Sequence, residues 1–306
     1  MNDKKIKIGY FADGPWAHLA FEKLMDDDSI EVCFVCVRYD KNDLELKALA
    51  KKNNIDVLSH PNINSEEFIS IMNKYNVDLF VSMSFNQIFR DTMINLPPLK
   101  TINCHAGKLP FYRGRNVLNW VLINDEPEFG ITVHYIDSGI DTGDIILQKT
   151  YPITDNDDYH TLLERSYVGC SDLLYKAIKL IQSGNVSTIK QSSIDKIGLY
   201  CGIRKPGDEI INWNQSSREI FNFVRALTNP GPGATSYIDG EEIKIYKVKL
   251  INGAREYKNT VGQVLYKTPC GSFYVKTLDT IIEVTDYKYS KNIRVGCRLK
   301  PQKELI

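Results

Sequence analysis

Two hydrophobic patterns alternate along the first half of the chain. Continuous apolar runs, such as IKIGYFAD at residues 6–13 and VDLFVSMSF at 77–85, are typical of strands buried on both faces of a sheet. Segments such as EEFISIMNKY at 66–75 repeat apolar residues every three or four positions and predict amphipathic helices. Further strands are predicted at 31–37 and 55–60 and in TINCHA, ITVHYID and DIILQKTYPI, and further helices through Phe21 and Leu24, at 44–53 and at 160–184. This alternation predicts an α/β domain with a mostly parallel sheet.

The pattern changes after about residue 190. A turn-rich stretch precedes a helix predicted at 217–229, which NPGPG ends, and short alternating strands follow. The strands are expected in TSYIDGEEIKIYKVKLI, GQVLYKT, GSFYVKT and IIEVTDYKY, which together predict a small β-barrel. We therefore expect a first domain at 1–190, a linker at 191–215, and a C-terminal helix plus barrel at 216–306.

Composition limits the function classes that need to be considered. The 306 residues carry 38 basic and 38 acidic side chains, which excludes the strongly basic composition of a dedicated nucleic-acid coat. No apolar run is long enough to span a membrane, and the N-terminus MNDKKIKIGYF lacks the features of a signal peptide. We expect a cytoplasmic protein that has no membrane partner.

The seven cysteines do not predict a metal site. Cys33 and Cys36 form a C-x-x-C, but they lie within an apolar strand pattern, and no second pair supplies further ligands. Residues three apart in a strand face opposite sides, which is poor geometry for sharing an ion. We expect these thiols to pack in the core and no metal to be bound.

The first strand is followed by GYFADG, which does not match a dinucleotide-binding turn. That fingerprint needs G-x-G-x-x-G, and only Gly9 and Gly14 are present. The sequence therefore argues against nicotinamide or flavin binding at this turn.

Candidate chemistry is concentrated in residues 102–148. Asn103 and His105 are two positions apart at a strand end, so an amide and an imidazole project to the same side. A loop with Lys108, Arg113 and Arg115 follows. Asp141 lies in the DTGD turn between two further strands, from which its carboxylate approaches His105 if those strands lie side by side.

These residues resemble the N10-formyltetrahydrofolate-dependent formyltransferases. The resemblance rests on N-x-H, then a leucine-proline-x-tyrosine-arginine-glycine loop, then D-T-G-D at the family's spacing. It implies a Rossmann-like formyl-transfer domain, followed in the longer members by a C-terminal OB-like barrel. It also implies N10-formyltetrahydrofolate as co-substrate, with no metal.

By the same resemblance, Asn103, His105 and Asp141 form the catalytic trio. The amide and the imidazole stabilise the oxyanion that forms when an amine attacks the formyl carbon. Asp141 orients His105 and accepts the amine proton, directly or through water. The remaining histidines, His18, His60, His134 and His160, have no comparable context and are expected at the surface or in packing.

The resemblance also assigns a pocket for the folate. The loop after the 77–85 strand and the turn before Asp141 are expected to line it, with ordinary loop packing as the alternative. The expected residues are Met83, Phe85, Ile88, Asp137, Gly139 and Ile140.

Three branches of the family use different amines. The chain is too long for the glycinamide ribonucleotide enzymes, which lack the barrel. Methionyl-tRNA formyltransferases carry a long basic insertion after the second strand, whereas VRYDKNDLELKALAKK here is short and charge-balanced. The third branch, the sugar-nucleotide N-formyltransferases, fits better, because RKPGD at 204–208 resembles the linker of UDP-4-amino-4-deoxy-L-arabinose formyltransferases.

We therefore expect formyl transfer to a nucleotide-linked amino sugar in cell-envelope polysaccharide or lipid A synthesis. Candidate substrate-binding residues are Trp16, Lys108, Tyr112, Arg113, Arg115 and Arg204. Guanidinium groups match phosphate geometry. Trp16 as a helix-start core residue and Lys108 as a solvated lysine are the structural alternatives.

Two other functions stay open at this stage. One is methionyl-tRNA formylation, although we expect no tRNA partner, and the other is a folate or nucleotide binding module without activity. The sequence does not identify the sugar or the nucleotide. It does not set the oligomeric state either, although C₂ homodimers are the commonest closed assembly.

Overall fold

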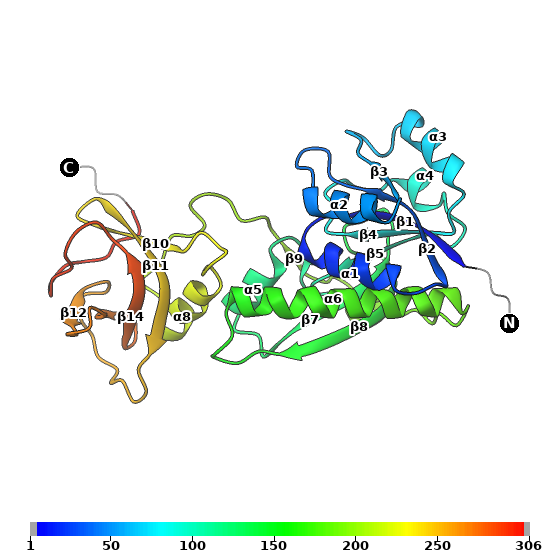
Figure 1. Ribbon diagram of the computed structural model, residues 1–306. Helices are drawn as coiled ribbons and strands as arrows, with labels where there is room; N and C mark the ends of the chain where they lie inside the picture. Colours follow the sequence, from blue (N-terminus) through cyan, green and yellow to red (C-terminus); the bar gives the residue numbers. More distant parts are fainter. Residues whose placement is uncertain (1–4, 303–306) are drawn as a thin grey trace. The chain divides into compact units, whose positions relative to one another are not determined.

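The computed structural model describes residues 5–302, which form two compact units (Figure 1). The first unit comprises residues up to 117 together with 129–151 and 164–201, and the second comprises 118–128, 152–163 and the residues from 202 onward. The helices are α1 (Pro15–Met25), α2 (Leu44–Lys52), α3 (Glu66–Tyr75), α4 (Asp91–Ile94), α5 (Val117–Ile123), α6 (Tyr159–Gln182), α7 (Gln191–Ile194) and α8 (Ser217–Arg225). The strands of the first unit are β1 (Ile6–Ala12), β2 (Ile30–Cys36), β3 (Asp56–Leu58), β4 (Leu79–Met83), β5 (Thr101–His105), β6 (Arg113–Gly114), β7 (Glu128–Tyr135), β8 (Ile145–Pro152) and β9 (Tyr200–Cys201).

A seven-stranded sheet in the order β3-β2-β1-β4-β5-β7-β8 organises the first unit. The pairs from β3 to β5 are parallel, as expected for strands joined by crossover helices. The direction changes at β7, which runs antiparallel to β5 and is followed through a turn by β8. This arrangement confirms the predicted α/β class with a mostly parallel sheet.

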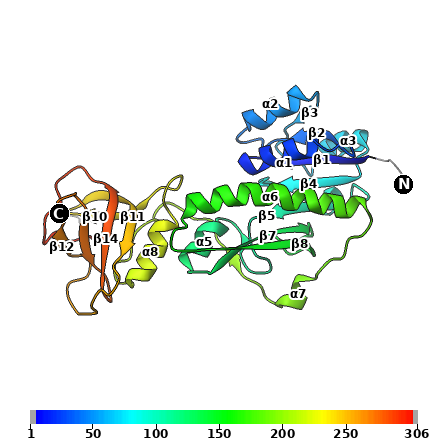
Figure 2. The same ribbon diagram turned by 60° about the horizontal axis from the view of Figure 1, so that its bottom comes forward.

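Helices cover both faces of this sheet, and alternation along β1 shows which helix lies on which face (Figure 2). Tyr10 points toward α1, where its hydroxyl donates to the carbonyl of Ala17 (3.1 Å). Phe11 points the other way into an aromatic cluster with Phe34 and Phe80. Phe68 of α3 also packs against Phe11, so α1 and α3 lie on opposite faces.

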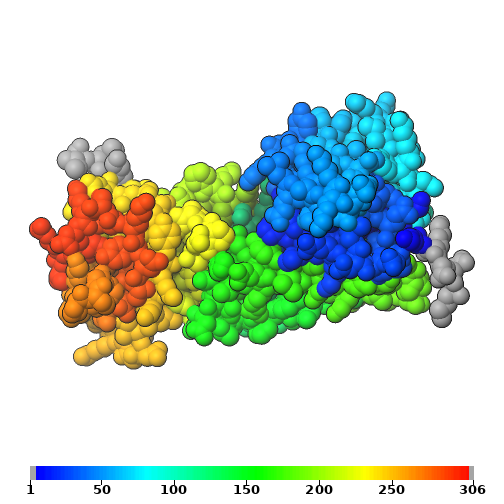
Figure 3. Space-filling model, in the orientation of Figure 1, coloured from blue at the N-terminus to red at the C-terminus, as the bar shows by residue number. Residues whose placement is uncertain are grey.

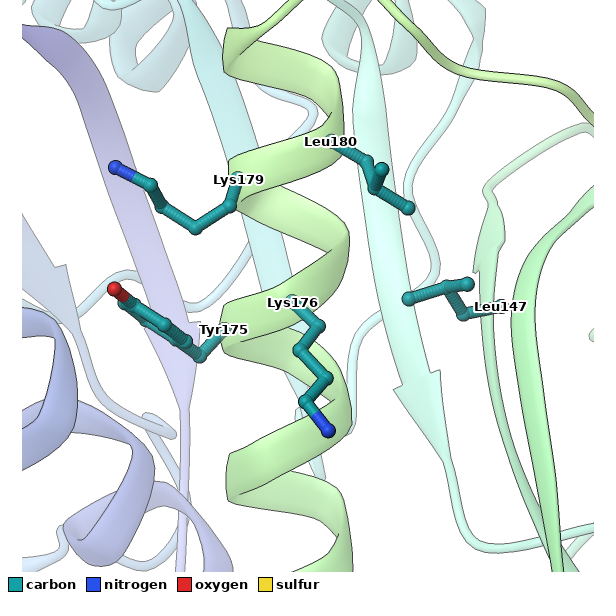
Figure 4. Close-up of a pocket in the computed structure, with 5 residues that line it drawn as sticks. All are labelled: Leu147, Tyr175, Lys176, Lys179 and Leu180. Carbon is teal, nitrogen blue, oxygen red and sulfur yellow. The ribbon is translucent and has the colours of Figure 1, made fainter.

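Asp27 connects the turn after α1 to the long helix α6. Its carboxylate accepts hydrogen bonds from the Ser29 amide (2.9 Å), the Ser29 hydroxyl (2.6 Å) and the Tyr175 hydroxyl (2.8 Å), and it pairs with the Lys179 ammonium (3.0 Å). Figure 4 shows Tyr175 and Lys179 leaving α6 on the same side. These contacts fix α6 on the sheet face that also carries α1.

A shallow depression lies beside this contact, on the outer surface of α6. Figure 4 shows Leu180 directed toward Leu147 of β8, and both line the depression with Tyr175, Lys176 and Lys179. On the face seen in Figure 3, side chains of α6, in green, form part of the molecular surface. None of the residues that line the depression is a predicted catalytic or binding residue.

The second unit is built on a five-stranded antiparallel sheet. Its strands are β10 (Ala234–Ile238), β11 (Glu241–Leu250), β12 (Val264–Lys267), β13 (Phe273–Lys276) and β14 (Ile281–Lys288), in the order β10-β11-β14-β13-β12. Residues 298–300 bridge to Tyr237 at one edge and to Gln263 at the other, which draws the two edges together. One continuous core, which includes Ile220 and Val224 of α8, fills the space beneath the sheet.

Helix α8 begins at a capping box. It also carries Arg218, whose contacts explain why segments 118–128 and 152–163 belong to the second unit. The Ser216 side chain accepts from the Glu219 amide, and the Glu219 carboxylate accepts from the Ser216 amide. Arg218 forms ion pairs with Asp125 (2.5 Å) and Asp155 (2.6 Å). Segments 118–128 and 152–163 are thereby joined to α8.

Most predicted elements match the observed ones within three residues, and α3 has the predicted bounds. Helix α8 is shorter than predicted: it ends at Arg225, and a turn in which the Leu227 amide donates to the Val224 carbonyl follows it. The elements α4, α7, β6 and β9, which have two to four residues, were not predicted because so few residues show little periodicity, and the seven-residue α5 was not predicted either. Within residues 5–302, no helix combines the length and apolar character that a bilayer crossing requires.

Replacement of Asp27 is predicted to make stability less dependent on acidic pH. Hydrogen bonds from Ser29, followed by the contacts with Lys179 and Tyr175, hold the pKa of Asp27 well below its ordinary value of 3.8. A carboxyl group with a lowered folded-state pKa stabilises the fold above its ordinary pKa, and the stabilisation is lost as the pH falls. Asp27→Asn should lower the free energy of unfolding by about 1 kcal/mol at pH 7, because solvent screens this half-buried group.

Urea unfolding at pH 7 and at pH 3 measures this difference. The gap between the parent protein and Asp27→Asn should shrink toward pH 3, whereas Asp28→Asn, at an exposed neighbouring position, should show a small and constant gap. A gap for Asp27→Asn that does not change with pH would contradict the assignment.

Candidate active site

Asn103 and His105 lie on β5 and point to the same face of the sheet. Cys104, between them, points the other way, and its thiol contacts the carbonyl of Cys170 on α6 (3.6 Å). Because successive strand residues alternate between faces, Asn103 and His105 project on the face opposite α6. Both side chains are half-buried, whereas Cys104 is buried.

The reversal of β7 adds a second imidazole beside Asn103. His134 on β7 is the direct cross-strand partner of Asn103, and such partners project on the same face. The His134 Nε2 atom lies 3.4 Å from Asn103 Nδ2, and the side chain is buried. His134 is thus buried, as the packing expectation allows, and it packs beside a predicted catalytic residue.

Asp141 lies in the turn between β7 and β8 with left-handed backbone (φ +53°). Its Oδ2 atom accepts a hydrogen bond from the Gly114 amide (2.9 Å). Gly143 is required two positions later, because a Cβ there would overlap the carbonyl group of Tyr135. The turn therefore brings Asp141 back over the residues of β5.

The three predicted side chains come together around the carboxylate of Asp141. Asp141 Oδ2 lies 3.6 Å from His105 Nδ1, and Asp141 Oδ1 lies 3.5 Å from Asn103 Nδ2. His134 Nε2 also lies 3.5 Å from Asp141 Oδ1. The structure thus collects an amide, two imidazoles and a carboxylate, from two strands and one turn.

The ring of His105 is oriented by the backbone of the following loop. Its Nε2 atom lies 2.7 Å from the carbonyl oxygen of Tyr112, which requires a proton on Nε2. The other nitrogen, Nδ1, therefore faces Asp141 and is the atom available to gain or lose a proton. Tyr112 has left-handed backbone (φ +57°), and a Cβ at Gly107 would overlap both the Tyr112 carbonyl and the His105 ring.

Asp141 is an ionised group inside this cluster. Burial alone would raise its pKa, but the charges of His105 and His134 and the hydrogen bond from the Gly114 amide outweigh burial. The net effect holds the pKa of Asp141 well below its usual range. A carboxylate at this position can accept a proton only transiently, or pass it on through a neighbouring group.

The residues predicted to bind folate differ in exposure. Ile88 and Ile140 expose 65% and 53% of their surface, and Phe85 is half-buried against Phe11 and Phe89. Met83 is fully buried and contacts the hydroxyl of Tyr10, so it contributes packing rather than ligand surface. Asp137 and Gly139 are exposed, and the Asp137 carboxylate accepts from the Gly139 amide and the Thr142 hydroxyl within the turn.

The predicted substrate-binding residues also divide into exposed and buried groups. Arg115 is exposed and Lys108 is half-buried. Arg113 is 6% exposed and donates to the side-chain oxygen of Gln191 rather than pointing into solvent, contrary to the phosphate contact expected for it. Tyr112 is buried, and its carbonyl group orients His105.

Trp16 and Arg204 pack against aromatic rings, each within its own unit. The Trp16 ring packs edge-on against Tyr167 (5.0 Å between centroids), which matches the packing alternative. Arg204 lies in the second unit, with its guanidinium between the rings of Trp120 (5.3 Å) and Phe223 (5.6 Å).

Two charged residues near the end of β1, Asp43 and Arg38, form contacts that the sequence did not predict. Asp43 caps α2 and also accepts from the Gly14 amide (2.7 Å) at the start of α1, while its carboxylate contacts His18 (2.7 Å). Arg38 pairs with Asp13 (3.3 Å) and donates to the carbonyl of Ser84. The N-terminus of α1 is therefore already occupied by a carboxylate.

The cysteines of the predicted C-x-x-C are packed in the sheet. Cys36 is buried, and burial raises the pKa of the half-buried Cys33 to about 11. Among residues 5–302, no three His, Cys, Asp or Glu side chains are grouped so as to hold a metal ion.

Comparison with known proteins gives the family context of this site. The family described as formyl transferase matches residues 4–178, and the formyl transferase C-terminal domain matches residues 204–296. A methionyl-tRNA formyltransferase of Geobacter metallireducens is 31% identical over 84% of this chain and 82% of its own length. A bifunctional polymyxin resistance protein, ArnA, of Wigglesworthia glossinidia brevipalpis is 30% identical over 98% of this chain, which spans 45% of that protein.

A solved structure of similar fold is WlaRD, a sugar 3N-formyl transferase crystallised in the presence of dTDP and 5-N-formyl-THF. It superimposes with a TM-score of 0.67 over 94% of this chain and 99% of its own, at 24% identity. At this level of identity the likeness supports the common fold alone.

Replacement of Gly107 by alanine is predicted to disturb the orientation of His105. A Cβ atom at this position overlaps the Tyr112 carbonyl and the His105 ring, so the imidazole must move relative to Asp141. A displacement of about 1 Å in such a site typically costs about 10²-fold in rate. Formyl-transfer kcat should fall by this order, with little change in circular dichroism.

Gly202→Ala is the matched control, since a Cβ there meets no atom within 4 Å. Equal activity of Gly107→Ala and Gly202→Ala would show that the Tyr112–His105 contact does not orient the ring.

Proposed function

We propose that this chain, which belongs to the formyl transferase family, transfers a formyl group from N10-formyltetrahydrofolate to the amine of a nucleotide-linked amino sugar. The proposed place of the reaction is the synthesis of cell-envelope polysaccharide or lipid A. The observation that carries the chemistry is the convergence of Asn103, His105 and Asp141 within 3.6 Å contacts around one carboxylate.

In the proposed reaction, the amine nitrogen of the sugar attacks the formyl carbon. The new C–N bond forms while the carbonyl electron pair moves onto oxygen. Asn103 can donate an amide N–H to this oxyanion, and a protonated His105 Nδ1 can do the same. Loss of one such donor typically costs about 3 kcal/mol of transition-state stabilisation.

The proton of the attacking amine must then leave, and the folate nitrogen must receive one as its bond to the formyl carbon breaks. Asp141 and His105 Nδ1 face one another, so a protonated His105 can give its Nδ1 proton to the leaving nitrogen and then regain a proton from Asp141, which takes it from the attacking amine. No net proton is gained or lost. A positioned base of this kind typically contributes about 10²–10⁴-fold in rate.

Two groups of side chains in the first unit are candidates to bind the folate and the sugar nucleotide. Ile88 and Ile140 offer apolar surface on the loop after β4 and on the Asp141 turn, and they are candidates to contact the folate ring. Arg115 is exposed two residues after Arg113 and is the candidate for a pyrophosphate contact. Lys108 is a second candidate for the same task.

The choice of acceptor rests on the connection between β2 and α2. It contains only residues 37–43, in which Arg38 and Lys41 are balanced by Asp40 and Asp43. The Arg38 guanidinium also forms an ion pair with Asp13 and donates a hydrogen bond to the carbonyl group of Ser84. A surface that binds the phosphates of a tRNA arm requires several basic groups free to contact them, so this connection favours a small acceptor.

Methionyl-tRNA formylation is the second candidate, and the sequence relatives favour it. A methionyl-tRNA formyltransferase matches 84% of the chain, and residues 201–306 carry 17 basic against 11 acidic side chains. WlaRD, a sugar 3N-formyl transferase that shares the fold over 94% of this chain, favours the sugar. A binding module without activity is the third reading, and the assembled cluster argues against it.

An acceptor panel separates these candidates. Purified protein with N10-formyltetrahydrofolate should add one formyl group to an amino-sugar nucleotide, detected by mass spectrometry. UDP-, dTDP- and GDP-linked amino sugars form the panel, with charged initiator tRNA as the competing acceptor. Formylation of the tRNA and of no sugar nucleotide would overturn the sugar proposal, and folate binding without any transfer would favour the binding module.

His105→Ala is predicted to remove turnover without removing folate binding. The imidazole supplies the oxyanion donor and the proton relay, whereas the folate is expected to contact the loops. The kcat should fall by about 10²–10⁴-fold. The dissociation constant for tetrahydrofolate, measured by calorimetry, should change little.

His160→Ala, at an exposed position in the second unit, is the control and should retain activity. Full activity of His105→Ala would contradict its catalytic role.

A further inference from the structure

We propose that Gln191, together with Arg113, is a positioning residue that holds Asp141 in its catalytic place. Sequence patterns assign Gln191 to a linker, but the structure places it in the first unit at the start of α7. The inference rests on the proposed role of Asp141 in proton transfer.

The carboxamide of Gln191 clamps the backbone of the Asp141 turn. Its Nε2 atom donates to the carbonyl oxygens of Asp141 (2.8 Å) and Gly143 (2.8 Å). These two acceptors flank the DTG bend, so one side chain holds both ends of it. The Gln191 side chain is buried, with an exposed fraction of 2%, which keeps water from competing for the same carbonyl groups.

Arg113 fixes the other end of the same carboxamide. Its Nε and Nη2 atoms donate to Gln191 Oε1 (3.0 and 2.7 Å), and its Nη1 atom donates to the carbonyl of Ile197 (3.2 Å). Because an arginine is only a donor, this contact assigns the oxygen of Gln191 and leaves its NH₂ group for the turn. The guanidinium also lies over the ring of Tyr200 (5.3 Å).

The side chain of Asp141 is held separately from its backbone. Gly114 lies in β6, which pairs with β9, and its amide donates to Asp141 Oδ2. Gly114 immediately follows Arg113 in the chain. Strand β6 therefore contacts Asp141 in two ways. The Gly114 amide binds its carboxylate, and Arg113, through Gln191, supports the backbone of its turn.

Elsewhere in the turn, the Asp137 carboxylate accepts from the Gly139 amide and the Thr142 hydroxyl, contacts that do not involve Asp141 itself. Residues 137–140 are exposed, and Asp141 has left-handed backbone. The contacts of its carboxylate with His105, Asn103 and His134 are 3.6, 3.5 and 3.5 Å long, which is too long to hold it by themselves. Without the clamp, the carboxylate can move relative to the imidazole, which is the displacement to which catalytic geometry is most sensitive.

The test is Gln191→Glu in the full-length protein. This variant keeps the shape of the side chain and the contact with Arg113, but it replaces the NH₂ donor by an oxygen that faces two carbonyl groups. The kcat of formyl transfer should fall by about 10²-fold. The KM for the folate should stay within about threefold, because Gln191 is not expected to contact it.

A second readout reports on Asp141 without any reaction. Hydrogen exchange of the Gly114 amide measures how firmly the carboxylate is held, and Gln191→Glu should raise its exchange rate by about tenfold or more. Gln182→Glu is the matched control, since Gln182 also donates to a backbone carbonyl, that of Ser29 (2.9 Å), on a helix that does not contact Asp141 through this group. This control should change neither kcat nor Gly114 exchange.

The outcomes separate the inference from the proposed function. Unchanged Gly114 exchange, or equal kcat losses in Gln191→Glu and Gln182→Glu, overturns the positioning role even in an active enzyme. Faster exchange together with no formyl transfer by the unmodified protein supports the clamp and overturns the function. If Gln191→Glu does not fold, Gln191→Ala removes the same donors without adding a charge and is judged by the same two measurements.

Discussion

The arrangement of the candidate site depends on the contacts of one half-buried, ionised carboxylate, that of Asp141. A charge with little access to water must be compensated by nearby donors and positive groups. Here the compensation comes from the Gly114 amide and from the imidazoles of His105 and His134. These partners come from separate segments of the chain, so the carboxylate brings together β5, β7 and the loop that follows His105.

Much of this architecture could be predicted because it depends on local pattern. Buried strands such as β4 and amphipathic helices such as α3 follow from the spacing of apolar residues within one short window. The pairing of Asn103 with His105 on one face follows from the two-residue period of a strand. Asp141 was predicted only from the family motif, because it lies 36 residues after His105 in the sequence and no local pattern indicates that the two side chains meet.

The residues that escaped prediction depend on which strands are neighbours. His134 faces Asn103 only because β7 lies antiparallel beside β5 in one register, and no short-range pattern encodes that register. Gln191 lies in a stretch whose turn-rich composition is typical of a linker, yet its side chain is buried against a turn some fifty residues earlier. For the same reason Arg113, which resembles a phosphate ligand in sequence, proves to be an internal support. Burial of a polar side chain is a property of tertiary structure, and composition does not reveal it.

The reversal of strand direction at β7 has a consequence for access to Asn103 and His105 on β5. Parallel neighbours require a crossover, usually a helix laid across one face of the sheet, and α3 and α4 belong to the connections that lead into β4 and β5. Where β7 reverses and β8 returns through a tight bend, the chain between β7 and β8 needs no such helix. His105 and Asn103 are therefore flanked by the Asp141 turn and the loop after β5, and such connections can change in length while the sheet beneath them stays the same.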